Sequence, residues 1–251
     1  MPVKLIDDLL ATLPEGQVQD VRVGVFWTAV VVKVDGRSKC GLASTLRNNH
    51  EHHHGGGAAV QDAGKLTGCT TRELAELARN GSLMEASIGM ATINALLPRH
   101  EDQWMDLNAE EVIAKNGESR RVALVGHFPF IPRLRERVGE LWVLELRPQG
   151  EDLPADAASE VIPQADVLAI TGTTLINGTF DGLMALRRPE TLVLVLGPST
   201  PLSPVLFDHG VHLLSGALVE DIQSVLRAVS QAANFRQVHR QGVRLVTMKK
   251  R

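Results

Sequence analysis

Apolar residues at the start of the chain recur at helical spacing, and the pattern then changes to a strand-like one. In residues 3–13 the apolar side chains fall three and four positions apart until Pro14, which predicts one short helix. From residue 18 onward valine-rich runs follow, and Asp35-Gly36 separates two of them. Asp-Gly between apolar runs is a strong hairpin signal. Residues 1–44 therefore predict a helix and an antiparallel meander.

The next part of the chain is polar before helical patterns return. Residues 46–68 are rich in glycine and histidine and predict a long loop, a kind of segment that usually carries function in compact domains. Thr70 and Ser82 are each followed three residues later by glutamate, the capping-box pattern that opens a helix. The second helix, residues 83–97, has small side chains that would let another backbone approach closely. We expect the polar residues 99–118 to connect two domains.

Beyond residue 118 the chain consists of short apolar runs, each followed by a turn and by helix-compatible sequence. These runs are residues 121–126, 141–146, 166–171, 191–197 and 211–214. Strands that are apolar throughout and alternate with helices are typical of a parallel sheet covered on both faces. The predicted fold class is α/β, with an N-terminal α+β domain over residues 1–118 and a C-terminal Rossmann-like domain over residues 119–251.

The ends of the predicted strands carry the candidate ligand-binding residues, because open parallel sheets bind ligands beyond the carboxyl ends of their strands. These candidates are Gly126, Phe128, Thr173, Thr174, Asn177, Gly197, Ser199, Ser215 and Gly216. Glycine lets backbone N–H groups come close to a ligand, and helix N-termini favour anions. We therefore expect a small anionic ligand. The alternative is that the threonines and Asn177 only cap helices and form turns.

A dinucleotide is not expected at this edge of the sheet. The first turn reads Gly126-His127-Phe128-Pro129 and lacks the G-x-G-x-x-G pattern, so neither NAD nor FAD is predicted. Glu145 lies 19 residues after Gly126, near the place of a ribose-binding acid. The alternative for Glu145 is a solvated or salt-bridged strand end.

Composition narrows the possible partners. The formal net charge is −3, and aromatic residues make up 4% of the chain with no tyrosine, which argues against a nucleic-acid partner and against a stacking platform for bases. No apolar run approaches the roughly 20 residues that span a membrane. The two cysteines, Cys40 and Cys69, do not form a disulfide framework, so a cytoplasmic location is expected. The oligomeric state is left open.

A histidine cluster is the candidate metal site. Residues 50–54 read His-Glu-His-His-His, and imidazole is a common ligand of transition metals. Alternate residues of an extended loop point the same way, so His50, His52 and His54 could bind one ion together, with Cys69 as a further candidate. The alternative is an exposed loop that binds metal adventitiously, because no C-x-x-C or H-x-x-x-H pair is present.

Two residues are candidates for acid–base chemistry. His127 directly follows a predicted strand, where ligands of parallel sheets bind. Glu85 stands near a helix start, and its alternative role is that of the capping-box acid.

Four longer motifs resemble a known family, the heavy-metal chelation family. They read EASIGMATINA at 85–95, VGHFP at 125–129, ITGTTLINGT at 170–179 and GPSTPLSP at 197–204. The resemblance implies an N-terminal domain like the capping domain of enolases, followed by a Rossmann-like domain. It also implies a cleft between the domains, lined by Glu85 and Asn94 from the first domain and by His127 and the other strand-end residues from the second.

The sequence and this resemblance together predict binding of a heavy metal, or of a metal-containing anionic small ligand, in an interdomain cleft. A transition-metal ion is then the expected cofactor or cargo. The alternative is a lyase or transferase acting on a small anionic or nucleotide-like substrate, in which Glu85 and His127 transfer protons. A third reading is a regulatory ligand-binding protein without chemistry. The fold does not separate these functions.

Overall fold

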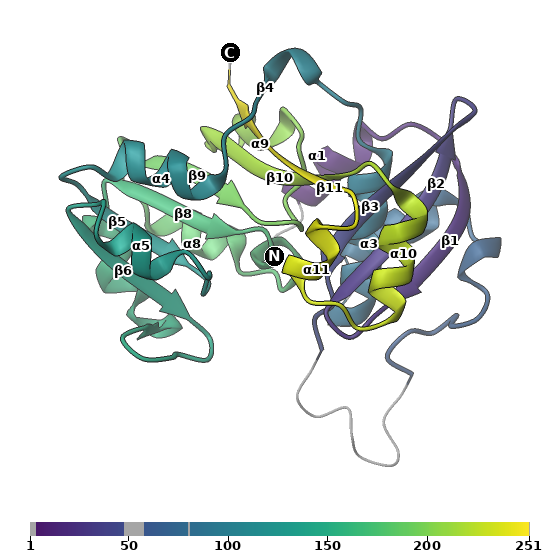
Figure 1. Ribbon diagram of the computed structural model, residues 1–251, viewed down its shortest axis with the longest axis horizontal. Helices are drawn as coiled ribbons and strands as arrows, with labels where there is room; N and C mark the ends of the chain where they lie inside the picture. Colours follow the sequence, from purple (N-terminus) through teal and green to yellow (C-terminus); the bar gives the residue numbers. More distant parts are fainter. Residues whose placement is uncertain (1–3, 48–57, 80, 251) are drawn as a thin grey trace.

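The structure is a computed structural model that describes residues 4–47, 58–79 and 81–250. It contains a three-stranded sheet and an eight-stranded sheet, which lie in the two halves of the molecule (Figure 1). The predicted mixed α/β class is confirmed, with an antiparallel N-terminal sheet and a mostly parallel C-terminal sheet. No helix in the described part of the chain is long and apolar enough to cross a membrane.

The first half follows the predicted order of elements. It comprises α1 (Lys4–Ala11), β1 (Gln17–Val23), β2 (Trp27–Val34), β3 (Arg37–Ser44), η1 (Leu66–Gly68), α2 (Thr71–Glu76), η2 (Leu77–Arg79) and α3 (Leu83–Leu96). The three strands pair antiparallel in the order β1-β2-β3. Asp35 and Gly36 join β2 to β3 with φ of 49° and 77°, the left-handed backbone that a tight hairpin turn requires. The hairpin prediction is therefore confirmed.

Close packing of α3 on β3 explains the small side chains of that helix. A Cβ atom on Gly41 of β3 would lie 2.1 Å from the carbonyl oxygen of Ala91 and 2.4 Å from the backbone nitrogen of Ala95. On the other side of α3, a Cβ atom on Gly89 would lie 2.1 Å from the backbone nitrogen of Ala78. The expectation that small residues admit a neighbouring backbone is therefore confirmed.

The second half is a doubly wound sheet. Its parallel strands are β5 (Arg121–Val125), β6 (Glu140–Glu145), β7 (Leu153–Pro154), β8 (Val167–Thr171), β9 (Leu192–Leu196) and β10 (Leu213–Val219). They lie in the order β7-β6-β5-β8-β9-β10. The chain winds first to one side of β5 and then to the other, so the switch point lies between β5 and β8.

Helices cover both faces of this sheet. They are α4 (Ala109–Gly117), α5 (Ile131–Arg135), α6 (Ala158–Val161), α7 (Thr173–Ile176), α8 (Phe180–Leu186) and α9 (Val205–Asp208), with the short turns η3 (Glu101–Gln103), η4 (Ala155–Ala157) and η5 (Ile162–Gln164). Two further helices, α10 (Ile222–Ser230) and α11 (Phe235–His239), lie between β10 and β11 in the chain. Side chains of α4 and α5 share one buried cluster with the sheet, whereas those of α6 to α9 share another.

Two observations differ from the sequence expectations. The segment 99–118 is not a plain connection, because β4 (Trp104–Met105) joins the sheet edge and Val112 and Ile113 of α4 are buried against it. The C-terminal β11 (Val243–Lys249) was not expected, and it pairs antiparallel with β10. Helix α10 packs its apolar side on β2 of the first sheet, so the two halves share buried contacts.

Candidate functional site

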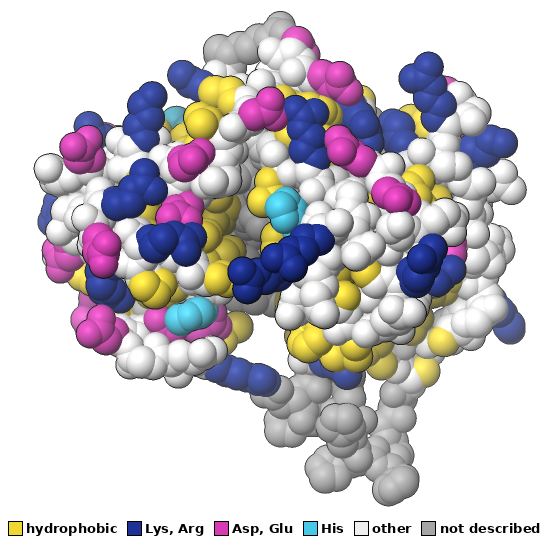
Figure 2. Space-filling view, viewed as in Figure 1, with side chains coloured by type: hydrophobic (Ala, Val, Ile, Leu, Met, Phe, Trp, Pro, Cys, Tyr) yellow, Lys and Arg dark blue, Asp and Glu magenta, His cyan; other side chains and the backbone are white. Residues whose placement is uncertain are grey.

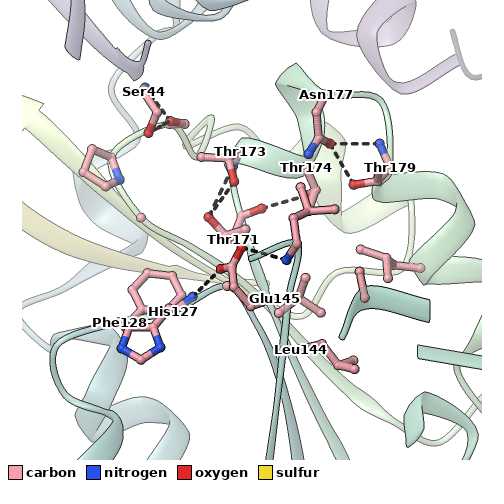
Figure 3. A pocket seen from close by; sticks show the side chains of 18 of the residues that line it. Ser44, His127, Phe128, Leu144, Glu145, Thr171, Thr173, Thr174, Asn177 and Thr179 are labelled. Atoms are coloured by element: carbon pink, nitrogen blue, oxygen red, sulfur yellow. Dashed lines mark hydrogen bonds between the residues drawn. The ribbon is translucent and has the colours of Figure 1, made fainter. Parts of the chain in front are cut away.

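A cleft of about 670 Å³ opens at the carboxyl ends of β5, β6, β8 and β9, at the switch point of the sheet. Trp27 and Ser44 of the three-stranded sheet also line it. Figure 3 shows part of this lining, and in the space-filling view the surface is hollowed between the two halves, with hydrophobic side chains on its walls (Figure 2). Eight predicted residues line the cleft: Gly126, His127, Phe128, Thr173, Thr174, Asn177, Gly197 and Ser199.

Three backbone N–H groups at the strand ends already have partners within the protein. The N–H of Gly126 donates to the Leu144 carbonyl at 2.9 Å, and that of Gly197 donates to the Ser215 carbonyl at 3.0 Å. The His127 N–H donates to Glu145 Oε2 at 2.9 Å. In addition, no lysine or arginine of the described chain lines the cleft. These three N–H groups therefore do not form the expected anion site. Side chains are left to bind a ligand in the cleft.

The imidazole of His127 lines the cleft and is held by a buried carboxylate. Its Nδ1 lies 2.7 Å from Asp152 Oδ2, and the Asp152 side chain is 3% exposed whereas that of His127 is 37% exposed. Asp152 also accepts the Gln149 N–H at 3.1 Å. A buried carboxylate at Nδ1 fixes the ring and favours the tautomer with a free lone pair on Nε2. His127 is thus oriented to act as a metal ligand or as a base.

Glu145 ends β6 beside His127 and lines the same cleft. Its carboxylate accepts the N–H groups of His127 at 2.9 Å and Leu146 at 2.8 Å, with a longer contact to that of Arg147 at 3.4 Å. These bonds tie the turn after β5 to the turn after β6 (Figure 3). Glu145 is therefore built into the framework of the site rather than being only a solvated strand end.

The threonine- and asparagine-rich turn after β8 is held by its own hydrogen bonds and also lines the cleft. Asn177 Oδ1 accepts the N–H of Thr179 at 3.1 Å and its hydroxyl at 2.7 Å, and the Thr174 hydroxyl donates to the Thr171 carbonyl at 2.8 Å. These bonds are those of turn formation. The Thr171 and Thr173 hydroxyls lie 3.0 Å apart and also line the cleft, so they can offer further hydrogen bonds to a ligand.

Ser199 joins the two halves at the cleft. Its hydroxyl oxygen accepts the Ser44 N–H at 2.9 Å and lies 3.2 Å from the Ser44 hydroxyl. Ser44 is the last residue of β3, and Ser199 follows β9. This pair connects the three-stranded sheet directly to the ligand-binding edge of the other sheet.

Four predicted residues lie outside the cleft. Glu85 is buried at the start of α3, where Oε1 accepts the Gln61 N–H at 2.8 Å. Asn94 donates from Nδ2 to the Leu42 carbonyl at 2.9 Å and lines a separate cavity of about 30 Å³. Ser215 and Gly216 do not form a strand-end turn, because β10 continues to Val219 in pairing with β11. The expectation of a fourth ligand-binding turn is therefore wrong.

Packing explains why Ser215 and Gly216 are small. The Ser215 hydroxyl lies 2.7 Å from the Thr247 hydroxyl of β11. A Cβ atom on Gly216 would lie 2.8 Å from the Leu202 side chain. Ser215 therefore contacts the neighbouring strand, and Gly216 packs against the Leu202 side chain.

The predicted metal ligands His50, His52 and His54 lie outside the described residues. Within the described ranges, no three His, Cys, Asp or Glu side chains come together as a metal site. Burial raises the pKa of Cys40 to about 12. Burial, followed by the carboxylates of Glu73 and Asp62, raises the pKa of Cys69. Both thiols are therefore poor sources of a metal-binding thiolate.

Asp152, Ser44 and Trp27 are site residues that the sequence analysis missed. Asp152 belongs to a turn and reaches His127 only after folding, across 25 positions of the chain. Ser44 and Trp27 come from the other sheet. The available signal for Glu145 was its place at the end of a strand pattern, whereas no spacing rule pointed to the other three.

Comparisons with known proteins support both halves of this description. Residues 108–248 match the DUF364 family model and residues 6–97 match the DUF4213 model, both described as "Putative heavy-metal chelation". A DUF364-family crystal structure of a protein of unknown function from Desulfitobacterium hafniense DCB-2 has a TM-score of 0.82 and 28% identity, covering 99% of this chain and 98% of that one. A DUF364-family structure from Pyrococcus horikoshii has a TM-score of 0.81 and 18% identity, covering 98% of both chains, and shows the shared fold.

A curated relative matches part of the chain. The uncharacterized protein MJ0500 of Methanocaldococcus jannaschii is 24% identical over 161 residues, which cover 61% of this chain and 62% of the relative. The match therefore spans somewhat less than two thirds of that relative's length. Since the DUF364 model alone covers more than half of the sequence and the DUF4213 model covers most of the rest, the chain belongs to the heavy-metal chelation family that these two models describe.

Proposed function

We propose that the cleft binds a metal complex of a small organic ligand, with Nε2 of His127 as the protein's ligand to the metal. The observation that carries this proposal is the contact of His127 Nδ1 with buried Asp152 Oδ2 at 2.7 Å. A carboxylate behind a histidine is the usual outer support of a metal-binding imidazole, since it orients the ring and raises its basicity. The family description of heavy-metal chelation agrees with this chemistry.

The donor set favours a complex over a bare ion. A free transition-metal ion usually takes three or four protein ligands, and the described residues contain no such group. A complex brings most of its donors with it and needs only one or two from the protein. His127 can supply one, and Glu145 or the Thr171 and Thr173 hydroxyls can bind polar groups of the organic ligand.

The remaining walls of the cleft suit an organic molecule. Phe128, Leu144 and Leu183 provide apolar surface, and pockets for small molecules combine such surface with a few polar groups. Among the described residues, Glu145 is the acid that lines the cleft, and no lysine or arginine lines it. We therefore propose that the protein recognises the positively charged metal of the ligand. A free anion is not the favoured ligand.

Proton transfer is the second candidate function, and the same residues favour it. A histidine held by a buried carboxylate is also the arrangement of a general base. In a lyase or transferase, His127 would accept a proton from a substrate bound in the cleft. Metal coordination and proton transfer differ in their spectroscopic signature, so one experiment separates them.

The test uses copper(II)–iminodiacetate, a complex with open coordination positions, and the full chain with His50, His52, His53 and His54 replaced by alanine. We expect one complex per chain, with nitrogen splitting from one imidazole in the electron paramagnetic resonance spectrum. His127→Gln should abolish this signal. Asp152→Asn should weaken binding about 10- to 100-fold, because an outer-shell partner of the imidazole is lost.

The matched control is His239→Gln, which removes an imidazole that does not line the cleft. This variant should bind the complex like the parent protein. Retention of the imidazole signal in His127→Gln, or its loss in His239→Gln, would contradict the proposal. Absence of any binding by the parent protein would move the proton-transfer function to first place.

A further inference from the structure

The cleft continues past His127 along the end of β6, where Glu145 meets an apolar surface. We infer that this part of the cleft is a subsite for an unphosphorylated nucleoside. The inference goes beyond the proposed function, because a nucleoside would bind here with or without a metal complex beside His127. It rests on the topology of the sheet, on the bonds of Glu145 and on the charges of the lining.

The topology puts Glu145 where a ribose is bound in related folds. The strand order β7-β6-β5-β8-β9-β10 is that of a doubly wound dinucleotide-binding sheet, and Glu145 ends β6 next to the turn that follows β5. In such sheets an acid about 20 residues after the first turn accepts hydrogen bonds from ribose hydroxyls. Glu145 lies 19 residues after Gly126 and lines the cleft.

The carboxylate of Glu145 retains capacity for such a bond. Two carboxylate oxygens accept about four hydrogen bonds in all. Oε1 accepts the N–H groups of Leu146 and Arg147, whereas Oε2 accepts that of His127. Oε2 therefore keeps one acceptor position for a ribose hydroxyl. The same bonds hold the carboxylate still, so little side-chain freedom is lost when a ligand binds.

The surface beyond Glu145 is apolar and can contact the flat face of a base. Leu146 is 69% exposed and lines the cleft, together with Ala155 of η4 and Ala158 of α6. Alanine side chains leave room against the backbone, and a large exposed leucine beside them is surface that a bound ring would cover. Phe128 adds an aromatic side chain to the same cleft. Three of the nine aromatic residues of the chain line it, namely Trp27, Phe128 and Phe235.

Two backbone N–H groups of the first turn are not available to a phosphate. In dinucleotide-binding sheets the pyrophosphate is held by free backbone N–H groups of this turn. Here the N–H of Gly126 is bonded to Leu144, and that of His127 is bonded to Glu145. No described lysine or arginine lines the cleft, so a phosphate would lose its hydration without gaining a partner. The subsite therefore selects nucleosides over nucleotides.

Isothermal titration calorimetry with adenosine, guanosine, cytidine and uridine tests the inference on the full chain. We expect at least one nucleoside to bind, its 2′-deoxy form to bind about tenfold more weakly through loss of one hydrogen bond, and its 5′-monophosphate to bind more weakly still. Ala155→Trp should fill the slot and remove binding. Asp156→Trp, at an exposed neighbour that does not line the cleft, should leave binding unchanged.

Three results would overturn the nucleoside subsite. They are the absence of binding by all four nucleosides, equal or tighter binding of the monophosphate, and unchanged binding in Ala155→Trp. The copper(II)–iminodiacetate titration is run in parallel, and its comparison with His127→Gln isolates the contribution of His127. If the nucleosides fail to bind and the copper complex binds, the nucleoside subsite is wrong and the proposed function stands. If a nucleoside binds and the copper complex does not, the proposed function is wrong and the nucleoside subsite stands.

Discussion

The two edges of the eight-stranded sheet use polar residues in opposite ways. At the amino edge, Asp166 accepts the Arg121 N–H at 3.0 Å and pairs with Arg188 Nη2 at 3.0 Å. At the carboxyl edge, Glu145 accepts only backbone N–H groups in the interactions described above, and His127 presents a ring to a cleft of about 670 Å³. The acid at the first edge pairs with arginine, whereas the acid at the second edge is held by backbone N–H groups beside the cleft.

This difference shows what an acid at a strand boundary does in a parallel sheet. Asp166 precedes β8 and bonds across to the first residue of β5, so it holds two strands in register. Glu145 is the last residue of β6 and holds two loops around a cavity. Both residues are acids at a strand boundary, but Glu145 lines the cleft of about 670 Å³ and Asp166 does not. The predictions below test whether stability and binding are separated in this way.

Asp166→Asn is expected to have the largest effect on stability. The carboxylate makes charge-assisted bonds to Arg121 N–H and Arg188, and losing such bonds typically costs about 2 kcal/mol. Urea unfolding should show this loss at pH 7, while the copper complex should bind as it does to the parent protein. The matched control is Asp156→Asn, which changes an exposed acid with no side-chain hydrogen bond among the described interactions and should cost less than about 0.5 kcal/mol.

The same variant tests the sign of the pH dependence. The Arg121 N–H bond to its carboxylate, helped by Arg188, lowers the pKa of Asp166 in the folded protein. Its contribution is therefore present above the unfolded value of about 3.9 and is lost as pH falls through the lower folded value. Asp166→Asn should be less sensitive to acid below about pH 4 than the parent protein. Equal acid sensitivity of both proteins would show that Asp166 is not the group responsible.

Gly197→Ala should have a moderate effect, at the opposite edge. Gly197 has φ of 102°, in the left-handed region, whereas a Cβ atom there would meet only the Phe128 side chain, at 4.0 Å. The cost is therefore backbone strain of about 1–2 kcal/mol. Gly182→Ala is the matched control, because Gly182 also lines the cleft but has helical backbone and open space for a Cβ. It should leave stability unchanged or raise it by up to about 1 kcal/mol.

Thermal or urea unfolding of the two glycine variants decides what these glycines do. A loss confined to Gly197→Ala means that the carboxyl edge needs glycine for its turn. Equal losses in both variants would show that space in the cleft, and not backbone conformation, makes glycine necessary there.

The architecture was more predictable from the sequence than the site. The apolar runs at 121–126, 166–171 and 191–197 gave strands because burial on both faces leaves a continuous pattern. The Asp35-Gly36 turn was equally clear, since few residues adopt its left-handed backbone. The strand β11 was missed because its alternation is interrupted by charged residues at its ends, and α4 because its polar face dominates the segment.

The site was only half predictable, for a physical reason. Strand-end rules locate residues such as His127 and Asn177, because topology alone fixes where strand ends lie. They cannot show that Asp152 turns back to His127, or that Ser44 meets Ser199 from the other sheet. Nor can they distinguish Gly126, which opens onto the cleft, from Gly216, which packs against Leu202. Such contacts depend on tertiary packing and not on local pattern.

The smallest expected effect belongs to His212, which precedes β10 and whose Nδ1 accepts the Val193 N–H of β9 at 3.0 Å. Burial, followed by Arg187 and Lys250, lowers the pKa of His212. The unfolded chain then binds a proton below about pH 6.5 before the folded protein does, so stability falls as pH drops from that value toward the lower folded pKa.

Solvent screening limits this effect to about 0.5 kcal/mol or less, because the imidazole is partly exposed. His212→Asn keeps an acceptor near the Nδ1 position but cannot titrate. The difference in Tm between pH 7.5 and pH 5.5 should therefore shrink in His212→Asn, while binding of the copper complex at pH 7.5 stays at the parent level. If the pH dependence is unchanged in this variant, another group controls it; if binding falls as well, the amino edge of the sheet is coupled to the cleft and the separation of the two edges does not hold.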